Sequence, residues 1–97
     1  GIVGAGAIGG LMGAALARAG HEVCVVARGA HLDAIRAAGL AVRSADGRYT
    51  VNVRAADDPS GFGVQDVVVI ALKAYSIGPM LPRLAPLLGP DTAVVTA

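Results

Sequence analysis

Short, uninterrupted apolar runs alternate along the chain with stretches whose apolar residues have helical spacing. The runs at residues 22–27 and 66–72 are continuous, which is typical of strands that are buried on both faces of a sheet. Residues 40–44 and 49–54 instead alternate between apolar and polar positions, and the Asp-Gly pair between them predicts a hairpin turn. The other predicted elements are strands at 1–3 and 92–96 and helices at 7–19, 30–38 and 76–88.

This order of elements predicts an α/β domain with a doubly wound parallel sheet of the Rossmann type. Right-handed crossovers give the strand order 3-2-1-4-5, with residues 40–44 as the third strand and residues 66–72 as the fourth. The last helix contains three prolines. Pro79 falls in its first turn, where proline is tolerated, whereas Pro82 and Pro86 predict that the helix is bent or shorter than its pattern.

Composition narrows the class of protein further. Hydrophobic residues make up 55% of the 97 residues and charged residues 15%, so the chain can build a core and is too apolar to be disordered. A net charge of +1 without any basic run argues against nucleic acid and membrane surfaces as partners. Cys24 is the single cysteine, which excludes an internal disulfide and favours a cytoplasmic protein.

Both ends of the chain interrupt predicted strands. Only Ile2 and Val3 precede the first glycines, whereas a strand usually has about five residues, and the chain stops within the apolar run 93–97. We therefore expect residues 1–97 to be one dinucleotide-binding domain, truncated at both ends, from a longer two-domain protein.

A glycine-rich turn lies between the first strand and the first helix. With 14 glycines in the chain, a bare G-x-G-x-x-G match is weak, but its position between a strand and a helix is the one that dinucleotide binding requires. Gly4 permits the tight turn, Gly6 lets a pyrophosphate approach the backbone, and Gly9 lets the helix pack against the strands. The free N–H groups at the helix start then face the phosphates. The predicted cofactor-binding residues here are Gly4, Ala5, Gly6, Ala7, Ile8 and Gly9.

The end of the second strand carries a cation where NAD-dependent enzymes favour a carboxylate. Such a carboxylate would accept hydrogen bonds from the ribose 2′-hydroxyl, but the strand here ends at Arg28, whose paired donors suit a 2′-phosphate. The predicted cofactor is therefore NADP, with a preference of about 1.5–3 kcal/mol from a hydrogen bond to a charged group. His31 could face the adenine or the phosphate, or only begin a helix.

Lys73 follows the strongest strand signal directly. In the predicted order this strand lies beside the first, so Lys73 is expected next to the glycine turn, in the crevice where ligands bind in such sheets. There it could meet the nicotinamide-side ribose, a phosphate or the substrate carboxylate, and Tyr75 and Ser76 are candidate walls of the same pocket.

The remaining polar residues do not form a recognisable reactive group. His21 and Cys24 are expected to be structural, and Asp57 and Asp58 are adjacent in a loop, where their side chains need not converge. No spacing indicates a metal site or a nucleophile–base pair.

Four spaced motifs together resemble the ketopantoate reductase (2-dehydropantoate 2-reductase) family, and the resemblance runs the length of the chain. They are Gly-Ala-Gly-Ala-Ile-Gly-Gly-Leu at 4–11, Ala-Gly-His-Glu-Val at 19–23, Ala-Arg-Gly at 27–29 followed by His31-Leu32, and Leu-Lys-Ala-Tyr at 72–75.

The resemblance implies NADPH-dependent reduction of ketopantoate to pantoate, a step toward pantothenate. It also implies that Arg28 meets the 2′-phosphate and that Lys73 lies in the cofactor site. The family's catalytic lysine and an acidic substrate-binding residue belong to a helical second domain, and an Asn-Gly pair follows the last strand. None of these is in this sequence, so no catalytic residue is expected in the fragment, and a homodimer would form through the missing domain.

Two alternatives stay open on the sequence. One is another NADP-dependent enzyme that acts on a different 2-oxo or hydroxy acid. The other is a nucleotide-sensing regulatory domain without enzymatic activity, although such sensors more often end the second strand in an acidic residue than in an arginine such as Arg28.

Overall fold

The computed structural model describes residues 1–4, 7–44 and 47–96, and its centre is a five-stranded parallel sheet. The strand order is β5-β2-β1-β6-β7, and all four pairings are parallel. The strands are β1 (Ile2–Val3), β2 (Cys24–Val26), β5 (Arg54–Ala56), β6 (Val67–Ile70) and β7 (Ala93–Thr96).

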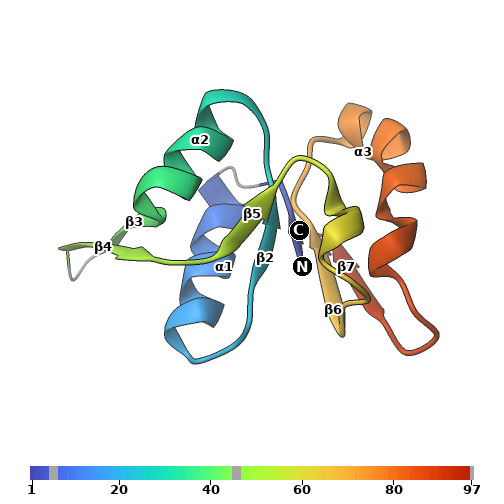
Figure 1. The fold of residues 1–97 in the computed structure, drawn as a ribbon, viewed down its shortest axis with the longest axis horizontal. Helices are drawn as coiled ribbons and strands as arrows, with labels where there is room; N and C mark the ends of the chain where they lie inside the picture. The colour runs from blue at the N-terminus through green and yellow to red at the C-terminus, as the bar shows by residue number, and fades with distance from the viewer. Residues whose placement is uncertain (5–6, 45–46, 97) are drawn as a thin grey trace.

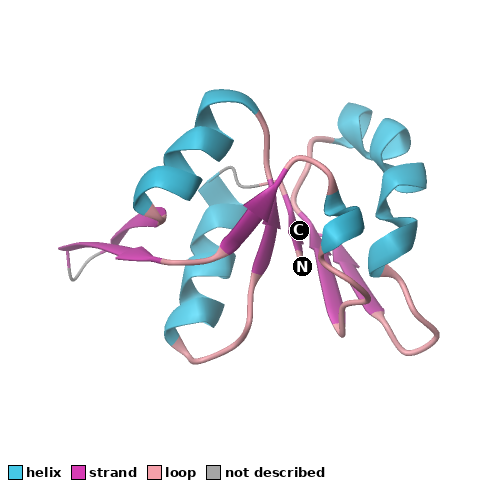
Figure 2. Ribbon diagram, in the orientation of Figure 1, coloured by secondary structure: helices cyan, strands magenta, loops and turns pink. Residues whose placement is uncertain are grey.

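Helices cover both faces of this sheet (Figures 1 and 2). Helices α1 (Ala7–Arg18) and α2 (Gly29–Ala38) lie on one face, and α3 (Ala74–Met80) and the 3-10 helix η2 (Leu81–Leu87) lie on the other. A second 3-10 helix, η1 (Pro59–Gly61), leads from β5 toward β6. This confirms the predicted doubly wound parallel sheet.

The core consists of two aliphatic clusters, one on each face. Ile2, Val25 and Val69 point toward α1 and α2, whereas their chain neighbours Val3, Val26, Val68 and Ile70 point toward η2. Adjacent side chains of a strand project to opposite faces, so a strand that is buried on both sides must be apolar at every position. Burial on both faces of the sheet therefore explains why the apolar runs in the sequence are continuous.

The outer strand beside β2 differs from the prediction. Residues 40–44 were expected there, but β3 (Leu40–Ser44) pairs antiparallel with β4 (Gly47–Val51) in a separate two-stranded hairpin. The position in the parallel sheet belongs to Arg54–Ala56, in register with Cys24–Val26. The hairpin packs on α1 instead, with Leu40 buried in the same cluster as α1. Periodicity predicted the hairpin correctly, but it could not tell which of three successive strands joins the sheet.

The proline-rich last helix is shorter than its pattern, as predicted, but Pro79 lies inside α3 and not in its first turn, because α3 begins at Ala74. Regular α-helix ends at Met80, and a 3-10 helix continues to Leu87 with Pro82 in its first turn and Pro86 inside it. Proline lacks the N–H that an α-helical hydrogen bond needs, which favours this change of geometry.

Candidate functional site

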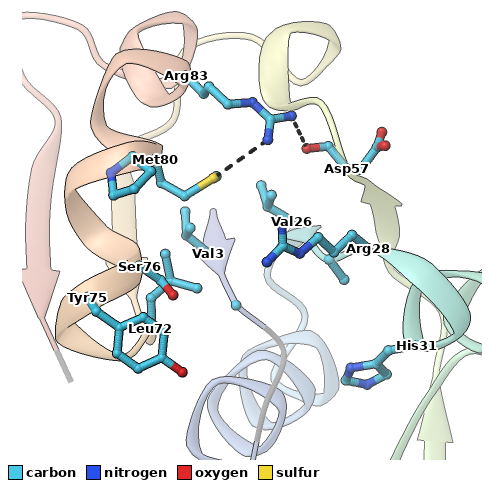
Figure 3. Close-up of a pocket in the computed structure, with 13 residues that line it drawn as sticks. Val3, Val26, Arg28, His31, Asp57, Leu72, Tyr75, Ser76, Met80 and Arg83 are labelled. Carbon is cyan, nitrogen blue, oxygen red and sulfur yellow. Dashed lines mark hydrogen bonds between the residues drawn. The ribbon is translucent and has the colours of Figure 1, made fainter.

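A pocket of about 680 Å³ opens at the carboxyl ends of the central strands (Figure 3). Such a volume is typical of sites for small molecules and cofactors. Its walls come from the ends of β1 and β2, the start of α2, the segment after β5, and the helical segment after β6. The lining residues are Val3, Gly4, Val26, Ala27, Arg28, His31, Asp57, Leu72, Tyr75, Ser76, Pro79, Met80 and Arg83.

The fold itself creates this crevice. The chain leaves β1 toward α1 on one face of the sheet, and it leaves the neighbouring β6 toward α3 on the other face. Connections that depart to opposite faces leave space between them at the strand ends, where open α/β sheets bind ligands.

Two glycines of the predicted turn are required by close packing. Gly4 has φ of +92°, and a Cβ there would lie 2.8 Å from the carbonyl oxygen of Ala71. Its N–H donates to the carbonyl of Val26 at 3.0 Å, which joins the end of β1 to the end of β2. A Cβ on Gly9 would overlap the carbonyl oxygen of Gly4 and approach Ala71 Cβ to 2.9 Å. Gly4 therefore makes the tight turn and Gly9 lets α1 pack closely, as predicted.

The other residues of the turn are described less fully. Ala5 and Gly6 lie outside the described residues, and only the backbone of Ala7 and Ile8 is described, where α1 begins at Ala7. The predicted contact of this turn with a pyrophosphate therefore stays a prediction.

Arg28 lies where the sequence places it. It precedes α2 with an extended backbone (φ −150°, ψ 166°), and its side chain makes no hydrogen bond that caps the helix. The side chain is exposed and extends into the pocket above the ends of β1 and β2 (Figure 3). His31, in the first turn of α2, lines the same pocket, so the structure brings both residues together.

Lys73 is adjacent to the pocket without lining it. It follows β6, which pairs with β1 as predicted, and it is the N-cap residue of α3, with an extended backbone. The lysine side chain is exposed, whereas Leu72, Tyr75 and Ser76 around it do line the pocket. Tyr75 and Ser76 are thus confirmed as pocket walls, and the role of Lys73 stays a prediction.

Arg83 and Met80 are pocket residues that the sequence reasoning missed. Arg83 Nη2 donates to the carbonyl of Asp57 at 2.7 Å, and its Nη1 lies 3.7 Å from Met80 Sδ. A signal for them was present, because Pro79, Met80 and Arg83 follow Ser76 at three, four and seven positions. This spacing marks one face of a helix, so naming Ser76 as a wall could have predicted the other three.

The two adjacent aspartates have different surroundings, as expected. The Asp58 carboxylate accepts a hydrogen bond from the Ser60 N–H at 3.0 Å and caps η1, and this bond holds the pKa of Asp58 below its usual value. Asp57 lines the pocket.

The other candidate reactive residues lie outside the pocket lining. Cys24 is buried in β2 and His21 is exposed in the turn before it. Within ranges 1–4, 7–44 and 47–96, no three His, Cys, Asp or Glu side chains are grouped to hold a metal ion.

These features define a Rossmann-type α/β domain: a parallel sheet, a glycine turn into α1, and a pocket at the strand ends. The sequence model of the family described as "Ketopantoate reductase PanE/ApbA" matches residues 1–97. The chain belongs to the ketopantoate reductase family.

Individual relatives agree with this assignment. The chain is 52% identical to a 2-dehydropantoate 2-reductase of Mesorhizobium japonicum over 96 residues, which is 98% of the chain and 29% of the relative. It superposes with a TM-score of 0.92 on a solved family member from Ralstonia solanacearum MolK2, at 47% identity over 97% of the chain and 29% of that protein. A 2-dehydropantoate 2-reductase from Geobacter metallireducens gives a TM-score of 0.88 at 34% identity, over 98% of the chain and 32% of that protein.

The chain therefore spans less than a third of the length of these relatives. Among the helices in the described part of the chain, none is both long enough and apolar enough to cross a membrane.

Proposed function

We propose that this chain is the NADP-binding domain of an enzyme that reduces 2-dehydropantoate (ketopantoate) to pantoate. Membership of the ketopantoate reductase family supports the reaction, and the pocket at the strand ends supports the cofactor. The observation that carries the choice of NADP is the Arg28 side chain, which extends into this pocket from the end of β2.

The residues of the pocket fit the adenosine end of this cofactor. Leu72, Pro79 and Met80 supply an apolar wall for the adenine ring, and the Arg28 guanidinium supplies paired donors for a 2′-phosphate. Among the described residues, Arg28 forms no ion pair with a carboxylate, so its charge is available to an anion.

The glycine turn fits the pyrophosphate. Gly9 lets α1 pack closely against Gly4, which lines the pocket, and the first N–H groups of a helix have no partner within the helix, so they could donate to a pyrophosphate. We assign the segment 4–9 to pyrophosphate binding and Lys73 to the nicotinamide-side ribose, a phosphate or the substrate carboxylate.

The cofactor supplies a hydride for the ketone carbon, and this domain binds and orients it. We place the residue that protonates the ketone oxygen in a helical domain of the longer enzyme, which would also form the homodimer. No catalytic residue is assigned to residues 1–97. The lone cysteine, Cys24, is buried and unpaired, which fits a cytoplasmic enzyme.

An assay of the full-length protein tests this proposal. NADPH oxidation is followed with ketopantoate and with a panel of other 2-oxo acids, and NADH serves as the cofactor control. We expect the highest kcat/KM with ketopantoate and NADPH. Oxidation of NADPH with another 2-oxo acid but not with ketopantoate would mean that the other acid is the substrate. Tight binding of a nucleotide without turnover of any acid would favour a regulatory domain.

A further inference from the structure

A second arginine enters the pocket from the wall opposite Arg28. Arg83 belongs to η2, on the α3 side of the crevice, whereas Arg28 belongs to the β2 side. Figure 3 shows both guanidinium groups over the ends of β1 and β2, on two sides of the same space. The two side chains come from segments more than fifty positions apart in the sequence, so only the fold brings them together.

Among the described residues, neither arginine forms an ion pair with a carboxylate, although the Asp58 carboxylate is near enough to Arg83 for the guanidinium charge to help lower the pKa of Asp58. The one ion pair in the described part of the chain joins Arg54 to Glu22, outside the pocket. Asp57 offers its backbone carbonyl to Arg83, and its carboxylate points away from the pocket in Figure 3. Two like charges that face one pocket repel each other, and an anion bound between them would offset this repulsion.

Arg83 is already held in place for such an anion. One N–H of the guanidinium donates to the Asp57 carbonyl at 2.7 Å, and Met80 Sδ lies 3.7 Å from the other terminal nitrogen. A guanidinium carries five N–H donors, so this bond leaves donors for a ligand. Because the side chain is fixed in advance, it loses little rotamer freedom when a ligand binds.

We propose that Arg83 is a specificity-determining residue that binds the 2′-phosphate of NADP together with Arg28. The inference rests on the proposed NADP binding and adds a second cation to the site. A phosphate dianion has three terminal oxygens, so it can accept hydrogen bonds from two guanidinium groups on different sides.

The test compares two ligands that differ only in the 2′-phosphate. Adenosine 2′,5′-bisphosphate and 5′-AMP are titrated calorimetrically into the full-length protein and into its Arg83→Gln variant. We expect Arg83→Gln to weaken binding of the bisphosphate about tenfold or more, as for loss of a charged hydrogen bond. Binding of 5′-AMP should change less than about twofold. Arg83→Lys keeps the positive charge but not the paired donors of the guanidinium, so we expect it to weaken binding of the bisphosphate less than Arg83→Gln does.

Arg36→Gln is the matched control. Arg36 is also exposed, and its Nε also donates to a backbone carbonyl, that of Ala55 at 3.2 Å, but it does not line the pocket. This variant should bind both ligands as the unchanged protein does. Arg28→Gln should lose the preference for the bisphosphate.

The outcomes separate this inference from the proposed function. An equal loss for both ligands in Arg83→Gln would mean that Arg83 only ties η2 to the segment after β5, and no loss would mean that it binds nothing. Either result overturns the inference while Arg28→Gln still supports NADP binding. If the unchanged protein does not prefer the bisphosphate, the NADP assignment itself fails, and the role of Arg83 fails with it.

Discussion

Single residues decide the chemistry of this pocket in two ways. Gly4 and Gly9 act by lacking a side chain, because a Cβ at either position would come too close to a neighbouring carbonyl oxygen. We propose that Arg28 acts by its charge at the end of β2, where it is exposed and has no carboxylate partner among the described residues. The glycines favour a dinucleotide of either kind, and in our proposal Arg28, with Arg83, separates NADP from NAD.

Arg28→Asp is expected to reverse this selectivity. The new carboxylate would repel a 2′-phosphate and could accept a hydrogen bond from a ribose 2′-hydroxyl. We expect NADPH binding by the full-length protein to weaken by about 1.5–3 kcal/mol or more, while NADH binding changes far less. Fluorescence titration of both cofactors measures the difference.

Arg48→Asp is the control for this reversal. Arg48 is exposed on β4 in the hairpin, away from the pocket-lining residues, so the same change of charge there should leave both affinities unchanged. Equal losses of the two cofactors in Arg28→Asp would contradict the assignment of the 2′-phosphate to Arg28.

At the scale of elements, the 3-10 helix η2 has two roles on opposite sides. Leu84 and Leu87 are 2% and 0% exposed and pack against β1, β2 and β6, while Arg83 reaches into the pocket. The short helix η2 therefore packs into one core cluster and also sets the position of the Arg83 backbone beside the pocket. A loss of packing between η2 and the sheet should therefore displace Arg83 and weaken binding in the pocket.

Leu84→Ala is expected to destabilise the protein and weaken cofactor binding. Removing a fully buried leucine side chain costs about 2–5 kcal/mol of the free energy of unfolding, because both transfer energy and packing are lost. Leu81→Ala is the control, since Leu81 is 53% exposed on the same helix, and its cost should be within about 0.5 kcal/mol. Urea denaturation gives both values. Similar costs for the two variants would contradict the packing of η2.

At the scale of the whole molecule, the structure joins a parallel sheet to a hairpin that stands apart from it. β1, β2 and β6 are buried between helices on both faces, whereas β3 and β4 pair only with each other and pack on α1. The most protected backbone is therefore expected at the centre of the sheet, beside the pocket.

Hydrogen exchange should report this difference. We expect the amides of β1, β2 and β6 to exchange most slowly and those of the β3–β4 hairpin to exchange faster, because local opening of the hairpin leaves the parallel sheet intact. NADPH should slow exchange at the start of α1, the start of α2 and along α3. Protection by NADPH in the hairpin instead would place the cofactor elsewhere.

Most of the fold could be predicted from the sequence because its signals are local. Continuous apolar runs reveal strands buried on both faces, and the glycine turn marks the passage from β1 to α1. The prolines predict where the last helix changes from α to 3-10 geometry. The strand beside β2 could not be predicted in this way, because Arg54–Ala56 is three residues long and carries no period of its own.

The sequence by itself determined a Rossmann-type sheet, a glycine turn into the first helix and an arginine at the end of the second strand. Each follows from residue types at neighbouring positions, since sterics and burial act there directly. Only the tertiary structure decided that β5 pairs with β2 at the edge of the sheet and that Lys73 lies beside the pocket without lining it. It also decided that Arg83 and Arg28 line the same pocket. These are contacts between distant segments, and packing of the whole domain, rather than any local preference, fixes them.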